Sequence, residues 1–167
     1  MATSTIAVVG GGLVGVTAAL ALAHRGYQVT LIDRQAPQAQ RGKLGMDIRN
    51  VALSPASQAL LDSVGLWGAT PAAPYQHMQV WEQWGNSELS FHAADVGCRQ
   101  LGWLVEVSPL LAHAWQHMSG RDNLTLWQSE IKDVDVCSER VDIGPATGNR
   151  RSFDFLIAAD GAQSLVR

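Results

Sequence analysis

Three glycines near the N-terminus have the spacing of a turn that binds a dinucleotide. Gly10, Gly12 and Gly15 form a G-x-G-x-x-G motif directly after the apolar run 6–9. In such a turn the first glycine permits a tight exit from a strand, the second lets the backbone approach a pyrophosphate, and the third lets the next helix pack closely. The phosphates lie at the helix N-terminus, where unpaired N–H groups favour negative charge, so Leu13 and Val14 belong to the predicted site.

The residues around this turn follow the order strand, helix, strand and acid. A helix is predicted from about Leu13 to Arg25, and the apolar residues 29–32 predict a second strand. Asp33 stands at the end of that strand, where its carboxylate can accept hydrogen bonds from the ribose hydroxyls of adenosine. The adjacent Arg34 is included in the predicted site. The run predicts a dinucleotide with a free ribose 2′-hydroxyl, and a purely structural turn is the alternative.

The composition is that of a globular protein without a basic surface for nucleic acid. The chain has 167 residues, of which 47% are hydrophobic and 16% charged, and its formal net charge is −3. Cys98 and Cys137 lie outside any C-x-x-C motif, so we expect reduced, buried thiols and a cytoplasmic protein. His113 and His117 have the spacing of two ligands on a helix but lack a third, so no metal site is predicted. Residues 1–23 carry no charged side chain, but the helix predicted there is too short to cross the ~30 Å of a bilayer core.

Elsewhere the sequence predicts further helices, strands and one long loop. Helices are expected after Ser54-Pro55 and Ser108-Pro109, because serine caps a helix N-terminus and proline suits its first position. The polar stretch 34–50 predicts a loop that can cover a cofactor. The predicted strands are a hairpin of residues 78–82 and 89–91, a meander of residues 124–127, 131–136 and 141–143, and a last buried strand of residues 153–159.

A second motif follows the last predicted strand. Residues 160–167 read D-G-x-x-S-x-x-R, beginning with Asp160 and Gly161 and ending with Arg167. Together with the N-terminal glycine motif, this resembles the class A flavoprotein aromatic hydroxylases related to para-hydroxybenzoate hydroxylase. Residues 49–54, 64–67 and 101–106 are similar to segments of the ubiquinone-biosynthesis hydroxylases, among them the pattern R-x-x-A-L-S followed by L-G-x-W.

The resemblance implies an FAD-dependent monooxygenase of the α/β class, with a Rossmann-like FAD-binding fold. NAD(P)H would reduce the flavin, and O2 would then serve to hydroxylate an aromatic ring, such as that of a polyprenylated phenol or quinol. The glycine motif would hold the FAD pyrophosphate, Asp33 the adenosine ribose, and Arg49 a phosphate or the flavin side. Asp160 and Gly161 match a motif associated with both FAD and the pyridine nucleotide. Catalytic residues stay unassigned.

The resemblance also implies a domain division. Residues 1–70 and 101–167 would form an incomplete FAD-binding domain, and residues 71–100 the beginning of a substrate-side sheet. Family members are longer, so we expect this chain to be the N-terminal part of a hydroxylase and inactive alone. Val107 and Pro109 depart from the pattern of the ubiquinone subfamily and its relatives.

Several functional alternatives stay open at this point. The same motifs occur in an NAD(P)-binding dehydrogenase and in a non-catalytic module that binds FAD or another nucleotide. The expected partner is a small aromatic substrate, and no nucleic acid is expected. Peripheral association with the inner membrane or with a biosynthetic complex, and homo-oligomerisation, are open expectations.

Overall fold

The computed structural model describes residues 3–38, 42 and 45–166, and its contacts group the chain into two compact units. The first unit contains residues 1–39 and 111–167, and the second unit contains residues 40–110. These units are defined by packing. The predicted division at residues 70 and 101 concerns which residues bind cofactor or substrate, and it stays a prediction.

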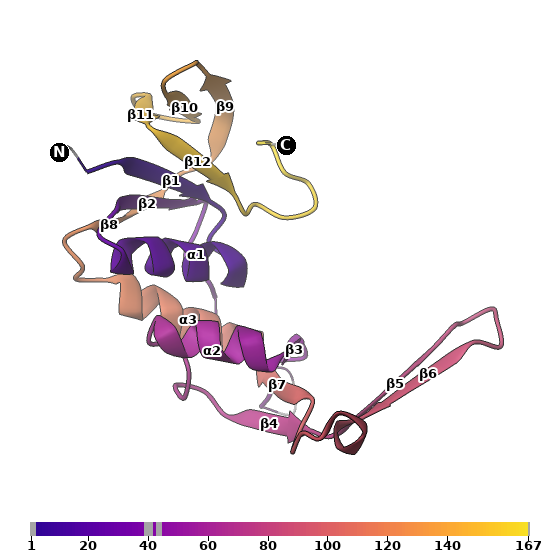
Figure 1. The fold of residues 1–167 in the computed structure, drawn as a ribbon. Coiled ribbons are helices and arrows are strands. Elements are labelled where there is room, and N and C mark those ends of the chain that lie inside the picture. The colour runs from indigo at the N-terminus through magenta and orange to yellow at the C-terminus, as the bar shows by residue number, and fades with distance from the viewer. Residues whose placement is uncertain (1–2, 39–41, 43–44, 167) are drawn as a thin grey trace. The chain divides into compact units, whose positions relative to one another are not determined.

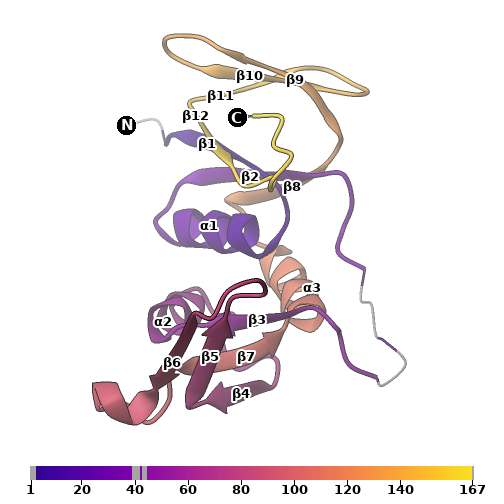
Figure 2. The same cartoon turned by 90° about the vertical axis from the view of Figure 1, so that its right-hand side faces the viewer.

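The first unit has three layers. Its parallel sheet has the strand order β12-β1-β2-β8, and helix α1 covers one face of this sheet (Figure 1). A small antiparallel sheet in the order β11-β10-β9 covers the opposite face (Figure 2). The bounds of these elements are β1 Thr5–Val9, α1 Leu13–His24, β2 Gln28–Asp33, β8 Leu124–Gln128, β9 Ile131–Val136, β10 Val141–Pro145, β11 Arg151–Phe153 and β12 Phe155–Ala158.

The central strands of the first unit are buried on both faces, which explains their nearly continuous apolar sequence. Successive residues of a strand point to opposite faces. Val9 and Ile32 therefore share one face, where they pack in a single core with Ile143 and Phe153 of the small sheet. Val8 is buried on the other face, toward α1. This packing fixes where β1 and β2 end, and the candidate site lies at those ends.

The second unit consists mainly of an antiparallel sheet and a hairpin. The sheet has the order β3-β7-β4, and the hairpin pairs β5 with β6. Ser54 caps helix α2 by accepting a hydrogen bond from the Ser57 N–H at 3.2 Å, and Pro55 begins the helix. The bounds are β3 Asn50–Leu53, α2 Pro55–Ser63, β4 Ala72–Tyr75, β5 His77–Trp81, β6 Glu88–His92, the short 3₁₀ helix η1 Ala93–Val96, and β7 Gly102–Glu106. Helix α3, Val107–Met118, begins in this unit and ends in the first.

The structure confirms the predicted helices and hairpin, although α3 begins at Val107, so that Ser108 lies in its first turn rather than at its N-cap. It corrects other expectations. The predicted meander is wrong in its first strand, because β8 pairs in parallel with β2. The predicted last buried strand is two strands, β11 and β12, and β12 is half-buried to exposed rather than buried. Between them the Asp154 carboxylate accepts a hydrogen bond from the Thr5 N–H at 2.7 Å. Strands β3, β4 and β7 have no counterpart among the predicted strands. Cys98 and Cys137 are free, as expected, but both are exposed rather than buried.

Two predicted features lie partly beyond the described residues. Residues 39–41 and 43–44 of the predicted loop 34–50 are among those outside the description, and so is Arg167. Among the residues that the structure does describe, no helix is long and apolar enough to cross a membrane.

Candidate cofactor site

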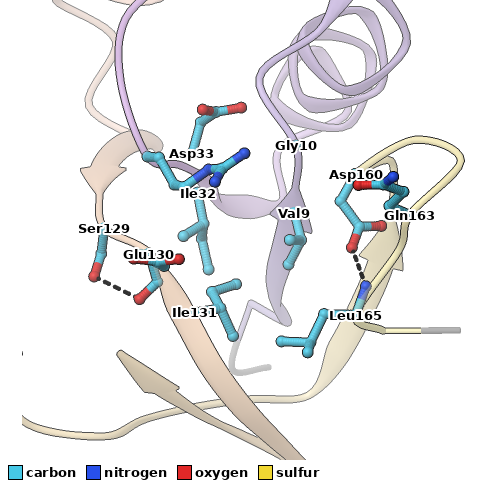
Figure 3. A pocket seen from close by; sticks show the side chains of 11 residues that line it. Val9, Gly10, Ile32, Asp33, Ser129, Glu130, Ile131, Asp160, Gln163 and Leu165 are labelled. Atoms are coloured by element: carbon cyan, nitrogen blue, oxygen red, sulfur yellow. Dashed lines mark hydrogen bonds between the residues drawn. The ribbon is translucent and has the colours of Figure 1, made fainter. Parts of the chain in front are cut away.

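The carboxyl ends of the parallel strands meet at one end of the sheet. Val9, Ile32 and Ala158 are in register at the ends of β1, β2 and β12, and Ile32 is in register with Trp127 of β8. The residues that follow these strands therefore lie close together. They line a cavity of about 400 Å³, whose wall is formed by Val9, Gly10, Ile32, Asp33, Arg34, Ser129, Glu130, Ile131, Asp160, Gln163 and Leu165 (Figure 3). Ligands of open parallel sheets bind in such a crevice outside the carboxyl ends of the strands.

Two glycines of the predicted turn are required by the packing of the backbone. Gly10 has φ +105°, and a Cβ atom there would lie 2.2 Å from the carbonyl oxygen of Ala159. A Cβ atom at Gly15 would lie 1.8 Å from the carbonyl oxygen of Gly10. A side chain at either position would thus collide with backbone atoms. Gly10 lets β1 turn beside β12, and Gly15 lets α1 start directly against that turn.

Gly12 has a different environment. It has an ordinary φ of −73°, and a Cβ atom there would meet nothing within 4 Å. Gly12 is the N-cap of α1, and no acidic residue stands in the first turn of the helix. The first N–H groups of a helix lack partners within the helix, so those that follow Gly12, including the N–H groups of Leu13 and Val14, can bind an anion. The open space at Gly12 and this set of donors fit a pyrophosphate.

Asp33 is fixed at the wall of the cavity by the backbone. Its Oδ2 accepts a hydrogen bond from the Gly11 N–H at 2.6 Å, and its Oδ1 accepts one from the Gln35 N–H at 3.2 Å. Each carboxylate oxygen can accept a second hydrogen bond, so both remain able to accept one from a ribose hydroxyl. Arg34 lines the same cavity.

Asp160 lies across the cavity from Asp33 and is held by its own loop. Its Oδ2 accepts a hydrogen bond from the Leu165 N–H at 2.9 Å (Figure 3). Burial alone would raise the pKa of Asp160. Hydrogen bonds from the Ser164 side chain and from backbone N–H groups outweigh it, so the pKa falls below its usual value. Oδ1 is buried and has no hydrogen-bond partner in the described chain, which leaves an acceptor for a ligand or water. Gly161, with φ +86°, allows the turn that follows.

Arg49 lies in the second unit, in a small polar cluster. Its Nη2 donates a hydrogen bond to Ser108 Oγ at 2.7 Å, and its Nε lies 3.6 Å from Asp47 Oδ1. Asp47 is buried, and its carboxylate also accepts the Arg49 N–H at 2.9 Å and the Ser108 N–H at 2.8 Å. Hydrogen bonding from the Ser108 side chain, followed by the Arg49 N–H, lowers the pKa of Asp47 to about 2. The Arg49 side chain is 56% exposed, and its contact with FAD stays a prediction.

Sequence reasoning missed part of this site. Ser129 and Glu130 line the cavity because they follow β8, and Gln163 and Leu165 line it from the loop after Asp160. The signal that could have found Ser129 and Glu130 was the order of the elements, because a strand that follows a helix commonly joins a parallel sheet. Trp115 of α3 was not among the predicted site residues. Its indole Nε1–H donates a hydrogen bond to the Gly11 carbonyl oxygen at 3.0 Å.

Comparison with known proteins shows the family to which this chain belongs. The sequence profile of a family described as an FAD binding domain matches residues 3–167. The chain belongs to this family. The 3-demethoxyubiquinol 3-hydroxylase of Escherichia coli (strain K12) is 34% identical over 169 residues, which cover 97% of this chain and 42% of that protein. The ubiquinone hydroxylase UbiL of Rhodospirillum rubrum is 32% identical and covers 97% of this chain and 38% of its own length. The FAD-binding chain thus spans less than half the length of these relatives.

Solved structures share the fold of this FAD-binding chain. The p-nitrophenol 4-monooxygenase PnpA from Pseudomonas putida DLL-E4 has a TM-score of 0.67 at 24% identity, over 99% of this chain and 43% of that chain. The 2,6-dihydroxypyridine-3-hydroxylase from Arthrobacter nicotinovorans has a TM-score of 0.66 at 23% identity, over 99% of this chain and 39% of that chain. At these identities the likeness shows the fold alone, which is the predicted Rossmann-like α/β fold that binds FAD.

Proposed function

We propose that this chain supplies the FAD-binding part of a monooxygenase that hydroxylates an aromatic ring with NAD(P)H and O2. The proposal rests mainly on the match to the Escherichia coli 3-demethoxyubiquinol 3-hydroxylase, which runs through nearly the whole chain. The strand-end cavity supports it, because Gly10 of the glycine turn and the carboxylates of Asp33 and Asp160 line the same space. The ring hydroxylated is proposed to belong to a polyprenylated phenol or quinol, by analogy with the substrates that the relatives' names state.

The residues of the candidate site would act by binding and orienting the cofactor. When bound, FAD supplies the redox chemistry that amino-acid side chains lack. The N-terminus of α1 would bind the pyrophosphate with backbone N–H groups, and Asp33 would accept hydrogen bonds from the adenosine ribose. The buried Oδ1 of Asp160 would accept a hydrogen bond from a hydroxyl of the cofactor. Arg49, held by Ser108 and Asp47, would place a positive charge near a phosphate or the flavin.

The test uses the full reading frame that encodes this chain. The purified protein should carry a bound flavin, visible in its absorbance spectrum, and should oxidise NAD(P)H with uptake of O2 in the presence of a demethoxyubiquinol analogue. Mass spectrometry should find one added oxygen atom that derives from O2. A flavin-free protein that instead reduces NAD(P)+ with an alcohol would favour a dehydrogenase. Bound flavin without any NAD(P)H oxidation would favour a non-catalytic module.

Membrane association is part of the same proposal. A polyprenylated substrate resides in a bilayer, so the enzyme would meet it at the inner membrane surface or within a biosynthetic complex. Flotation with vesicles that contain the substrate analogue should bring the protein to the vesicle fraction. Cross-linking and light scattering of the same sample should report any homo-oligomer. A protein that stays in the dense fraction at every salt concentration would contradict peripheral association.

A further inference from the structure

The middle residue of the glycine turn is held on both sides. The Gly11 N–H donates to Asp33 Oδ2 at 2.6 Å, and the Gly11 carbonyl oxygen accepts the indole Nε1–H of Trp115 at 3.0 Å. Trp115 is only 8% exposed, so this hydrogen bond is shielded from water. The G-x-G-x-x-G motif places no requirement on this position. In the structure, however, a Cβ atom at Gly11 would lie 2.5 Å from Trp115 Cζ2 and 3.0 Å from Asp33 Cβ.

The Trp115 hydrogen bond also determines where the next N–H group points. The peptide bond between Gly11 and Gly12 is planar and trans, so its carbonyl and its N–H point in opposite directions. Because the Gly11 carbonyl points toward Trp115, the Gly12 N–H points away from the indole. Within the described chain the Gly12 N–H donates to no protein acceptor. It is therefore available to a ligand on the open side of the turn, where a Cβ at Gly12 would also meet nothing.

We infer that Trp115 is a positioning residue for FAD, acting through the Gly11–Gly12 peptide without touching the cofactor. The inference rests on the proposed FAD site and adds one residue of α3 to it. Without the indole N–H the buried Gly11 carbonyl would lose its partner, and the peptide could rotate. The Gly12 N–H would then leave the direction that suits a pyrophosphate. If Trp115 served only the core, its substitution would lower the stability of the fold but would not weaken ligand binding at the turn in a protein that remains folded.

Trp115→Phe tests the inference, because it removes the indole N–H and keeps an aromatic ring. Isothermal titration of the purified protein with ADP-ribose and with FAD should show affinity reduced about 5- to 30-fold, which is the effect of one or two kcal/mol. The control is Trp127→Phe in β8, where the ring stacks with Arg151 at 4.2 Å and does not line the cavity. This control should bind both ligands within twofold of the wild type. In ¹H–¹⁵N spectra, the shift of the Gly12 amide on addition of ADP-ribose should shrink in Trp115→Phe only.

A double-variant experiment tests the contact itself. Gly11→Ala places a methyl group against Trp115 Cζ2, and Trp115→Phe removes that atom. The loss of ADP-ribose affinity in the double variant should therefore be smaller than the product of the two single losses. In the wild type, ADP-ribose should slow hydrogen exchange of the Trp115 indole N–H, and this measurement needs no substitution.

The outcomes separate two failures. A wild-type protein that binds neither ADP-ribose nor FAD overturns the proposed cofactor site, and this inference with it. Wild-type binding with unchanged affinity in Trp115→Phe overturns the role of Trp115 alone. Strict additivity of the two substitutions, or indole exchange that ADP-ribose does not alter, also overturns it.

Discussion

Gly12→Val should remove cofactor binding without unfolding the protein, whereas Gly10→Ala should damage the fold itself. The two glycines belong to one motif but have opposite surroundings. Gly12 has φ −73° and open space where a Cβ would lie. Gly10 has φ +105°, and its Cβ would lie 2.2 Å from the Ala159 carbonyl oxygen. We therefore expect Gly12 to be needed for ligand binding and Gly10 for the turn itself.

The expected magnitudes follow from these surroundings. At Gly12 a side chain restricts the unfolded chain, which stabilises the fold by about 0.4–1 kcal/mol, while a less suitable N-cap costs a similar amount. The net change in the free energy of unfolding should stay within about 1 kcal/mol, or about 2–4 °C in Tm. At Gly10 the left-handed backbone alone costs about 1–3 kcal/mol, and the collision with Ala159 adds to it. The valine of Gly12→Val would occupy the approach of the pyrophosphate, so FAD affinity should fall at least about 100-fold, or about 2.8 kcal/mol.

The assay combines thermal unfolding of the ligand-free proteins with titration of FAD and ADP-ribose. Gly12→Val should unfold close to the wild-type temperature and bind neither ligand measurably. Gly10→Ala should unfold several degrees lower. The reasoning is refuted if Gly12→Val is as unstable as Gly10→Ala, or if Gly12→Val binds FAD with wild-type affinity.

Three further predictions concern carboxylates. Asp33→Asn should weaken ADP-ribose binding by about 1–3 kcal/mol in calorimetry, because charge-assisted hydrogen bonds to the ribose are lost; an effect no larger than that of the control Asp62→Asn would contradict the assignment. Asp47 has a folded pKa of about 2, below the ordinary 3.8, so it stabilises the fold above about pH 4 and this contribution is lost as the pH falls toward 2. Asp47→Asn should thus lower Tm at pH 7 and make the fall of Tm between pH 4 and 2 less steep. A variant whose Tm falls as steeply as that of the wild type over this range would contradict the prediction. Hydrogen bonds from the Thr5 N–H and hydroxyl lower the pKa of Asp154, so Asp154→Asn should reduce Tm above pH 4 more than below pH 3, and equal losses at both pH values would argue against it.

The first half of the site could be predicted because its signals are local. The turn, the helix that follows it and the strand that ends at Asp33 occupy one short stretch, and each has its own sequence signature. In the structure Gly10, Asp33 and Arg34 line one cavity, as expected if that stretch forms a single site. The second motif could also be found, because Asp160 comes two residues after the end of an apolar strand, β12.

The part that was missed depends on pairing between distant segments. The sequence of β8 is compatible with either an antiparallel meander or a parallel sheet, and only its pairing with β2 decides between them. Without knowledge of that pairing, Ser129 and Glu130 cannot be assigned to the cavity, because they line it only as a result of following the end of β8. The contact between Trp115 and Gly11 joins residues 104 positions apart, and the glycine motif carries no information about it.

The position of Asp33 couples the shape of the turn to the choice of ligand. One oxygen of its carboxylate holds the Gly11 N–H and the other holds the Gln35 N–H, so the group cannot rotate away from the cavity without losing a hydrogen bond. A ribose 2′-hydroxyl can donate to this fixed carboxylate, whereas a 2′-phosphate would bring negative charge against it. Rotation that relieved this repulsion would also release the Gly11 peptide, which Trp115 holds from the other side. In the proposed site, the same carboxylate would therefore favour a ligand with a free 2′-hydroxyl and would keep the glycine turn in the conformation that receives it.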